Sequence, residues 1–254
     1  MRIPLTPLGQ SGFRFQFDGC VVYVDPYLSN SVEKTEGEAL RRMVPIRIDP
    51  ARITDASYVF ITHVHLDHCD PETIVPISLA SPRCRFICPA EVASRLKNFG
   101  VAGDRIVVAR EEWMTLDGGL RVRPAPASHP AIERDQEGNP RCLGYVMECA
   151  GRRIYHAGDT SVCREMLDTL AGVGPIEVAM LPVNECNYYR HTAGIIGNMT
   201  VREAFRLATD IGAKVLVPMH WDMFEVNSVF PEEIELLYKL IRPNVELVLN
   251  PTEI

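Results

Sequence analysis

Three histidines and an aspartate stand within six residues of one another, at His63, His65, Asp67 and His68. They follow the apolar run of residues 58–62, which indicates a buried strand that ends at the cluster. Imidazole nitrogens and carboxylate oxygens are the usual ligands of zinc and manganese. The alternative, a polar turn with solvated side chains, is disfavoured because four such groups stand so close together in the sequence. The stretch therefore predicts a metal site.

The spacing of these residues indicates how they are placed. Side chains two apart on an extended strand point the same way, so we expect His63 and His65 to face one ion. Asp67 and His68 then lie past the turn and can reach a second ion. Two ions about 3.5–4 Å apart form an arrangement that cleaves esters and phosphodiesters with an activated water. The motif thus favours metal-assisted hydrolysis.

The composition is that of an ordinary globular protein. The 254 residues are 46% hydrophobic and 23% charged, and no linker divides them, so we expect a single domain over residues 1–254. The formal net charge of −7 argues against nucleic acid as a standing partner, because phosphate backbones require a basic stripe. A small anionic substrate held by local cations remains compatible with this charge.

The N-terminus and the cysteines favour a cytoplasmic location. The first residues show no basic segment followed by an apolar stretch, so no signal peptide is expected, and no apolar run reaches membrane-spanning length. The eight cysteines include no Cys-x-x-Cys pair, and we expect reduced thiols. Cys69, next to His68, is expected to be a buried filler.

Strand and helix patterns alternate along the chain, which predicts an α/β fold. Strands are expected at residues 13–17, 20–25, 58–62, 85–88, 105–109, 120–129, 143–148, 152–156, 177–182, 214–220 and 246–250. Helices are expected to begin near residues 71, 89, 162, 200 and 231. The charged segment 29–49, with a short helix expected within 33–42, is long for a loop, and such loops often form the rim of an active site.

Most of the histidines share one relation to these strands. Five of the seven lie at or just past the carboxyl end of an expected strand, and Asp159 lies in an equivalent place. Strand ends converge on one edge of a sheet, where α/β folds collect their sites. We therefore expect His129, Asp159 and His220 to join the cluster at residues 63–68.

This order of motifs resembles the metallo-β-lactamase superfamily: His-Val-His-Leu-Asp-His at 63–68, a lone His129, Gly158-Asp159 and Pro218-Met-His220. The resemblance covers nearly the whole chain. It implies a four-layer αββα sandwich, with two sheets back to back, helices outside and the metals at one edge. It also implies two sets of ligands and a bridging carboxylate: His63, His65 and His129 for one ion, Asp67, His68 and His220 for the other, and Asp159 for both.

The branch of the superfamily is indicated by smaller motifs. Flavodiiron proteins have a glutamate where His65 stands, which disfavours oxygen reduction, and the interval from Asp159 to His220 is too short for the nucleases with a long inserted domain. The stretches 183–187, 197–200 and 212–222 are similar to L-ascorbate-6-phosphate lactonase-like proteins. This chain is shorter at its ends than the bacterial lactonase and has His129 where that enzyme has an aspartate, so the family is better supported than the substrate.

The resemblance implies a lactonase that opens a phosphorylated sugar lactone with two divalent ions, Mn²⁺, Zn²⁺ or Fe²⁺. We expect Asp67 or Asp159 to pass a proton to the leaving alkoxide. Tyr189, Arg190 and His191 lie between the metal motifs, and the planar fork of Arg190 suits a phosphate. A solvated loop or a contact between subunits explains these three residues equally well.

Two other functions fit the same ligands. One is a phosphodiesterase of the same fold that acts on a nucleotide or a phospholipid head group. The other is a metal-binding regulatory protein without turnover, which an intact ligand set disfavours. The roles of the 186–199 loop and of His156, either a hydrogen-bond partner of a ligand or a core histidine, stay open. The expected partner is a small molecule, no membrane is expected, and a homo-oligomer is compatible with the sequence.

Overall fold

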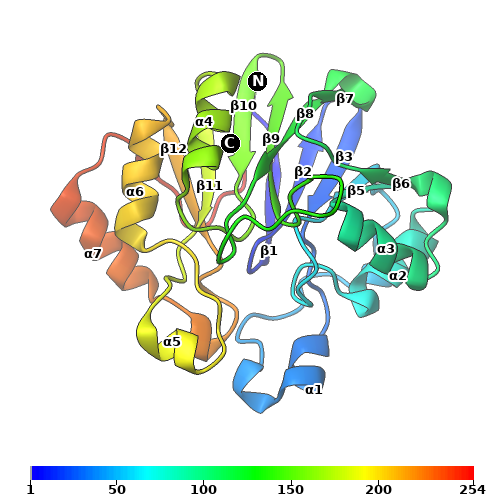
Figure 1. The fold of residues 1–254 in the computed structure, drawn as a ribbon, viewed down its shortest axis with the longest axis horizontal. Coiled ribbons are helices and arrows are strands. Elements are labelled where there is room, and N and C mark those ends of the chain that lie inside the picture. Colours follow the sequence, from blue (N-terminus) through cyan, green and yellow to red (C-terminus); the bar gives the residue numbers. More distant parts are fainter. Residues whose placement is uncertain (1) are drawn as a thin grey trace.

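The computed structural model describes residues 2–254 and contains two β-sheets packed face to face, with helices on both outer surfaces (Figure 1). The four-layer αββα sandwich predicted from the sequence is confirmed. Each sheet is mixed, with parallel strands on one side and antiparallel strands on the other. No helix within residues 2–254 combines the length and the apolar composition that crossing a membrane requires.

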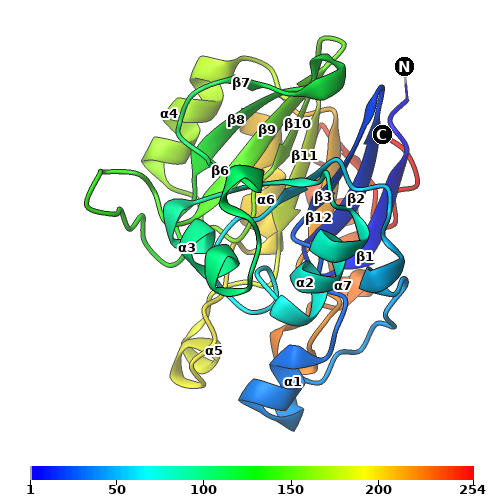
Figure 2. The same cartoon turned by 90° about the vertical axis from the view of Figure 1, so that its right-hand side faces the viewer.

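The first sheet has six strands, which follow one another across the sheet in chain order: β1 (Leu5–Gly9), β2 (Gly12–Phe17), β3 (Cys20–Val24), β4 (Tyr58–Phe60), β5 (Arg85–Cys88) and β6 (Ile106–Val108). β1 to β3 are antiparallel, and β3 to β6 are parallel. Helices α2 (Pro71–Ala80) and α3 (Ala90–Asn98) lie on its outer side (Figure 2). Ile74, Ile77 and Leu96 of these helices are buried in a cluster with Val59 and Phe86 of the sheet.

The second sheet has seven strands in the order β13-β12-β11-β10-β9-β8-β7: β7 (Met114–Thr115), β8 (Arg121–Pro126), β9 (Leu143–Cys149), β10 (Arg152–His156), β11 (Val178–Pro182), β12 (Val215–Met219) and β13 (Glu246–Leu247). β10 to β13 are parallel, and β7 to β10 are antiparallel. Helices α4 (Arg164–Val173), α6 (Val201–Asp210) and α7 (Pro231–Ile241) lie on the outer side (Figure 1). The predicted capping box at Thr200 and Glu203 starts α6.

Large apolar side chains from both sheets form the central core. Phe15, Phe60, Tyr145 and Met147 are fully buried in one cluster. The Tyr145 hydroxyl donates a hydrogen bond of 2.8 Å to the carbonyl of Ile61, so the phenol is satisfied inside the core. This contact ties the second sheet to the chain that leaves β4, which brings the strand ends of the two sheets together.

Two short helices, α1 (Ser31–Glu36) and α5 (Tyr188–Thr192), lie at one end of the sandwich, while both chain termini lie towards the other end (Figures 1 and 2). A small cluster of Tyr27, Val32, Met223 and Phe224 packs α1 against the chain that follows β12. The end of the sandwich that carries α1 and α5 is the end where the predicted ligands gather.

The structure differs from the predicted elements in a few places. β1 is not predicted because its sequence does not alternate, and its pairing with β2 stabilises it. The strand predicted at 58–62 ends at Phe60, the one predicted at 120–129 ends at Pro126, and the closing strand is only Glu246–Leu247. The histidines therefore come from loops beyond the strands, not from extended strand ends.

Candidate metal centre

The predicted ligands all lie on loops that follow strands of the two sheets. The loop after β4 carries four of them, and the loops after β8, β10 and β12 carry one each. All seven fall into three overlapping groups in which the ligand atoms lie within 4.8 Å of one another: His63, His65 and His129; His63, His68 and Asp159; Asp67, His68 and His220. The fold thus brings together residues that are far apart in the sequence.

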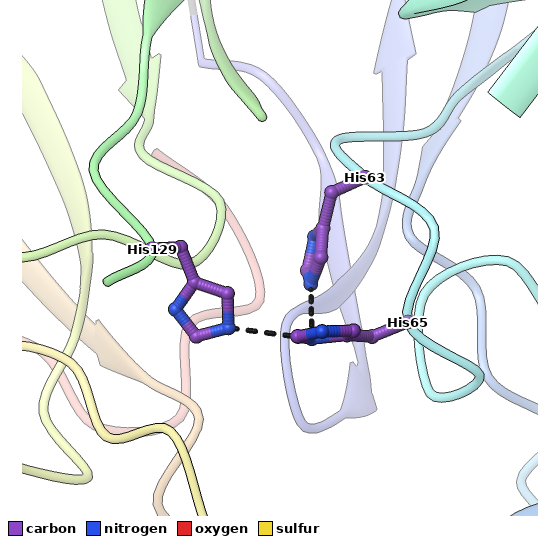
Figure 3. Close-up of side chains that lie close together, drawn as sticks. All are labelled: His63, His65 and His129. Carbon is purple, nitrogen blue, oxygen red and sulfur yellow. Dashed lines mark hydrogen bonds between the residues drawn. The ribbon is translucent and has the colours of Figure 1, made fainter. Parts of the chain in front are cut away.

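The first group consists of three imidazoles that face one another (Figure 3). His63 Nε2 lies 2.9 Å from His65 Nδ1, and His129 Nε2 lies 3.3 Å from the same nitrogen. Ligands bound tetrahedrally at about 2.1 Å from one ion lie about 3.4 Å apart. These nitrogens are therefore spaced like neighbours in one coordination shell.

A further set, called the second group from here on, combines the carboxylate of Asp67 with the imidazoles of His68 and His220. Asp67 Oδ2 lies 3.6 Å from His68 Nε2 and 3.5 Å from His220 Nε2. These distances are too long for hydrogen bonds and close to the ligand spacing around one ion. The second group is thus also spaced as a coordination shell.

Asp159 contacts both groups. Its Oδ2 lies 3.0 Å from His220 Nε2 and 3.7 Å from His129 Nε2, and its Oδ1 lies 3.4 Å from His68 Nε2. A single buried carboxylate therefore stands between the two sets of nitrogens, which is the position that a bridging ligand requires.

The two groups differ in their electrostatics. Burial lowers the pKa of His63 well below its usual range and that of His129 to about 4, so both rings are neutral at pH 7. Burial acts in the same direction on His220, but the carboxylates of Asp159 and Asp67 outweigh it and raise the pKa of His220 to about 9. The second group thus favours a positive charge beside its carboxylates.

Two buried ligand atoms show how the residues fit a metal. His68 Nε2 and Asp159 Oδ1 have no hydrogen-bond partner among residues 2–254. Buried polar atoms are almost always paired, so an unpaired nitrogen and oxygen 3.4 Å apart indicate a place for a cation. Histidine with aspartate suits zinc, manganese or iron, and these residues therefore fit divalent ions of that kind.

Asp25 supports the second group and is missing from the sequence prediction of the site. It is fully buried, and its Oδ2 lies 2.7 Å from His68 Nδ1. Thr62 donates to it twice, from the hydroxyl to Oδ2 at 2.6 Å and from the backbone N–H to Oδ1 at 2.8 Å. A carboxylate on one ring nitrogen keeps the other free for a metal. The signal in the sequence is the position of Asp25, directly after β3.

Gln10 is a second supporting residue that the sequence analysis does not identify. Its side-chain amide donates to Asp67 Oδ2 at 2.7 Å and lies 3.1 Å from His220 Nε2. Its backbone carbonyl accepts from the His220 N–H at 3.0 Å, and its own N–H donates to Asp222 at 2.9 Å. Gln10 and His220 both adopt positive φ, 57° and 60°, and these bonds hold the strained backbone in place.

Gly158 explains the Gly-Asp pair of the motif. Its φ is 62°, and a Cβ there would lie 2.7 Å from the Leu143 carbonyl oxygen and 2.9 Å from Thr62 Cβ. Any other residue would push the chain away from Thr62. The glycine therefore allows Asp159 to approach the histidines of the first sheet.

Comparison with known proteins agrees with this geometry. The family described as "Beta-lactamase superfamily domain" matches residues 21–221. A UPF0173 metal-dependent hydrolase of Alkaliphilus metalliredigens is 31% identical over 253 residues, which cover 96% of this chain and 97% of that protein. This chain belongs to the UPF0173 family of metal-dependent hydrolases. That family lies within the metallo-β-lactamase superfamily, so the superfamily predicted from the sequence is confirmed.

Solved structures share the fold of this hydrolase. The metallo hydrolase Igni18 of Ignicoccus hospitalis has a TM-score of 0.72 and 22% identity, with 100% of this chain and 98% of that chain covered. An isothiocyanate hydrolase from Delia radicum gut bacteria has a TM-score of 0.75 and 18% identity, with the same coverage. At 18–22% identity, these two matches establish that the chain shares the αββα fold.

His156 has a structural role in this hydrolase. It is fully buried, donates from Nε2 to the Ser11 carbonyl at 2.8 Å, and accepts at Nδ1 from the Gly158 N–H at 3.3 Å. Burial lowers its pKa, which keeps the ring neutral, as these two bonds require. His156 thus holds the chain just before Asp159 and belongs to none of the three ligand groups within residues 2–254.

A pocket of about 430 Å³ opens next to the ligands. His65, Asp67, His129, Asp159 and His220 line its inner end. The rest of its wall comes from Leu66 in the loop after β4, from the segment around α1, from residues 193–196 behind α5, and from Phe224 and Asn227 after β12. The pocket thus borders five of the seven predicted ligands.

The three residues predicted to bind substrate do not line this pocket. The Arg190 guanidinium donates to the backbone carbonyls of Asn184, Glu185 at 3.1 Å and Ser228 at 2.6 Å. Tyr189 is 81% exposed, and His191 is also exposed. The Arg190 guanidinium is thus hydrogen-bonded to backbone carbonyls, and the neighbouring segment 193–196 lines the pocket instead.

Cys69 is fully buried and belongs to none of the ligand groups found within residues 2–254, which agrees with its predicted role as a filler.

Proposed function

We propose that this hydrolase binds two divalent ions and cleaves a carboxylic ester, with a lactone as the leading candidate. The observation that carries the proposal is Asp159, whose two oxygens lie between one imidazole group and the other. A carboxylate in that position suits a pair of ions better than a single ion. The pocket beside it provides space for a substrate.

The proposed ligand sets follow the groups in the structure: His63, His65 and His129 for one ion, Asp67, His68 and His220 for the other, and Asp159 for both. When bound, the ions supply polarisation of the scissile carbonyl and a lower pKa for a nucleophilic water. The imidazole and carboxylate donors suit Zn²⁺, Mn²⁺ and Fe²⁺.

Two aspartates are candidates for the proton transfer to the leaving alkoxide. Both line the pocket, but the side chain of Asp67 is 16% exposed and that of Asp159 only 4%. Gln10 holds Asp67 in place through the bond to Oδ2. We assign the proton transfer to Asp67 because it is the more exposed of the two in the pocket: its carboxylate would take the proton that the nucleophilic water loses and pass it to the leaving alkoxide.

The charge of the pocket disfavours a phosphorylated lactone. A phosphate at the far end of a substrate requires a cation of its own, whereas the phosphate of a phosphodiester would lie on the two ions themselves. Among the described residues that line the pocket, none is a lysine or an arginine. We therefore propose hydrolysis of an ester or lactone without the phosphate group that the sequence prediction assigned to Arg190. A regulatory role without turnover has less support, because the ligands open onto a pocket.

Proton release in a pH-stat tests the proposal. Protein loaded with zinc or manganese would be given neutral esters, plain and phosphorylated lactones, and phosphodiesters, with an Asp159→Asn variant as the control. We expect release from neutral esters or lactones well above the control. Release from phosphodiesters alone would replace the proposal with phosphodiesterase activity.

A further inference from the structure

The pocket wall beyond the ligands is mostly apolar. Of the ten lining residues that are not predicted ligands, seven have apolar side chains: Val32, Leu40, Leu66, Ala193, Ile195, Ile196 and Phe224. Val32 and Phe224 are 4% and 3% exposed and belong to the small cluster that packs α1 against the chain after β12. One side of the pocket is thus continuous with a packed apolar cluster.

The opposite side, residues 193–196, is held by polar contacts behind it. Asn198 donates to Asn184 at 2.8 Å, and Asn184 donates to Asn227 at 3.0 Å. At Gly197, a Cβ would lie 2.1 Å from the Glu185 carbonyl oxygen, so the chain there needs a glycine to pack this closely. Together with the carbonyl contacts of Arg190, these bonds fix the wall that carries Ile195 and Ile196.

The charge at the mouth of the pocket is negative. Glu36, at the end of α1, is exposed and is the one charged lining residue within 2–254 that is not a predicted ligand. Two basic residues of this segment face other groups: Lys34 pairs with Glu72 at 2.6 Å, and Arg42 donates to the carbonyls of Ser29 and Val44. Arg41 is exposed and does not line the pocket. A substrate group that enters here meets apolar carbon and one carboxylate.

We infer that the pocket binds an uncharged apolar acyl chain of the substrate and disfavours a chain that carries negative charge. The inference rests on the proposed function, since the chain is taken to be the acyl part of the hydrolysed ester. Apolar walls gain free energy from each buried methylene, and they give an anionic group no partner to replace water. A volume of about 430 Å³ is in the range of small-molecule sites.

Calorimetric titration of the zinc-loaded protein with three hydroxamic acids tests the inference without turnover. Acetohydroxamate carries the metal-binding head alone, octanohydroxamate adds an apolar tail, and suberic acid monohydroxamate has a tail of equal length that ends in a carboxylate. We expect octanohydroxamate to bind at least about tenfold more tightly than acetohydroxamate, since each buried methylene is worth about two- to fourfold. The anionic tail should lose most of that gain.

Variants of the wall identify the residues responsible. Ile195→Ser should reduce the preference for octanohydroxamate several-fold and leave acetohydroxamate binding unchanged. Leu79→Ser is the matched control, because Leu79 is 76% exposed on α2 and does not line the pocket. Glu36→Lys should improve binding of the anionic tail about two- to fivefold. Glu38→Lys, with the same change of charge outside the lining, should improve it less.

The outcomes separate the inference from the proposed function. Equal affinities for the three compounds, no binding of octanohydroxamate, or tighter binding of the anionic tail would overturn the inference, whatever the ester assay shows. The expected ranking without hydrolysis of any ester would support the apolar pocket, and would show that the chain it binds belongs to a substrate with a different scissile bond.

Discussion

The metal centre and the pocket wall lie side by side but are built differently. The ligands follow strands of both sheets, and the central core holds those strands in place. The wall comes mostly from the segment around α1, residues 193–196 and the chain after β12, which lie at the end of the sandwich. In the proposed function, the core therefore positions the ligands, while peripheral segments select the substrate. Changes in one region should therefore leave the other intact.

The largest effect is expected at Asp159, where the two ligand groups meet. Asp159→Asn keeps the shape of the side chain and removes the charge between His68, His129 and His220. We expect a loss of metal and a fall in kcat/KM larger than the about 10–100-fold typical of outer hydrogen-bond partners. Metal content and steady-state rates measure both. Full activity with unchanged metal content would contradict the bridging role.

A smaller effect on the same centre is expected at Asp25. Asp25→Asn weakens the contact with His68 Nδ1, so metal affinity should fall by about 10–100-fold. Competition with a chromophoric chelator measures this affinity. Asp18→Asn is the control. Asp18 is exposed and follows the end of β2, and its substitution removes the same charge without touching His68. Equal affinities in the two variants would show that Asp25 does not orient the ligand.

The difference between Asp159 and Asp25 also shows which residues of the site the sequence reveals. Asp159 is predictable because it stands in a motif with a glycine, whereas Asp25 stands alone at the end of the strand predicted at 20–25. Its role depends on β3 lying beside β4, a pairing between segments more than thirty residues apart. The α/β class and the seven predicted ligands follow from local patterns, and the four layers from the resemblance to the superfamily. The pairing of strands does not.

The pocket wall was harder to predict for a related reason. Arg190 looks like a phosphate ligand in the sequence, because nothing local indicates that the carbonyls of Asn184 and Ser228 receive its guanidinium. Ile195 and Ile196 look like ordinary apolar residues of a loop until the fold shows that they line one pocket with Phe224 and Val32. The inferred selectivity for substrate therefore depends on tertiary contacts, which spacing alone does not encode.

Gly197→Ala should damage the wall and spare the metals. The added Cβ cannot stay 2.1 Å from the Glu185 carbonyl, so residues 193–196 must shift. We expect KM for a neutral ester to rise about three- to tenfold, which corresponds to the loss of a methylene or two of apolar contact, at unchanged metal content. Gly172→Ala in α4 is the control, since a Cβ there has open space. A loss of metal in Gly197→Ala would show that the two regions are not separable.

The smallest effect is expected outside both regions, at Glu148 on β9. Burial would raise the pKa of Glu148, but hydrogen bonds and charge from Arg153 and Arg121 outweigh it and hold the pKa below its usual 4.5. A lowered pKa contributes stability above the unfolded value, and this contribution is lost as the pH falls through the folded value. Glu148→Gln should therefore cost less than about 1 kcal/mol at pH 7.

Denaturant unfolding of the wild type and Glu148→Gln at pH 7 and below pH 4.5 measures this difference. The gap between the two proteins should narrow in acid, with metal content and KM unchanged at pH 7. A gap that widens in acid would contradict the assigned ion pairs.

The dinuclear centre is tested most simply by the number of ions that each chain holds. Protein purified without metal would be dialysed to equilibrium against zinc or manganese, and the bound metal would be counted by elemental analysis against protein concentration. The account predicts two ions per chain, with the count reduced in Asp159→Asn and unchanged in Gly197→Ala. One ion per chain, or two ions that Asp159→Asn retains at full affinity, would contradict a centre built from the loops that follow strands of both sheets around one shared carboxylate.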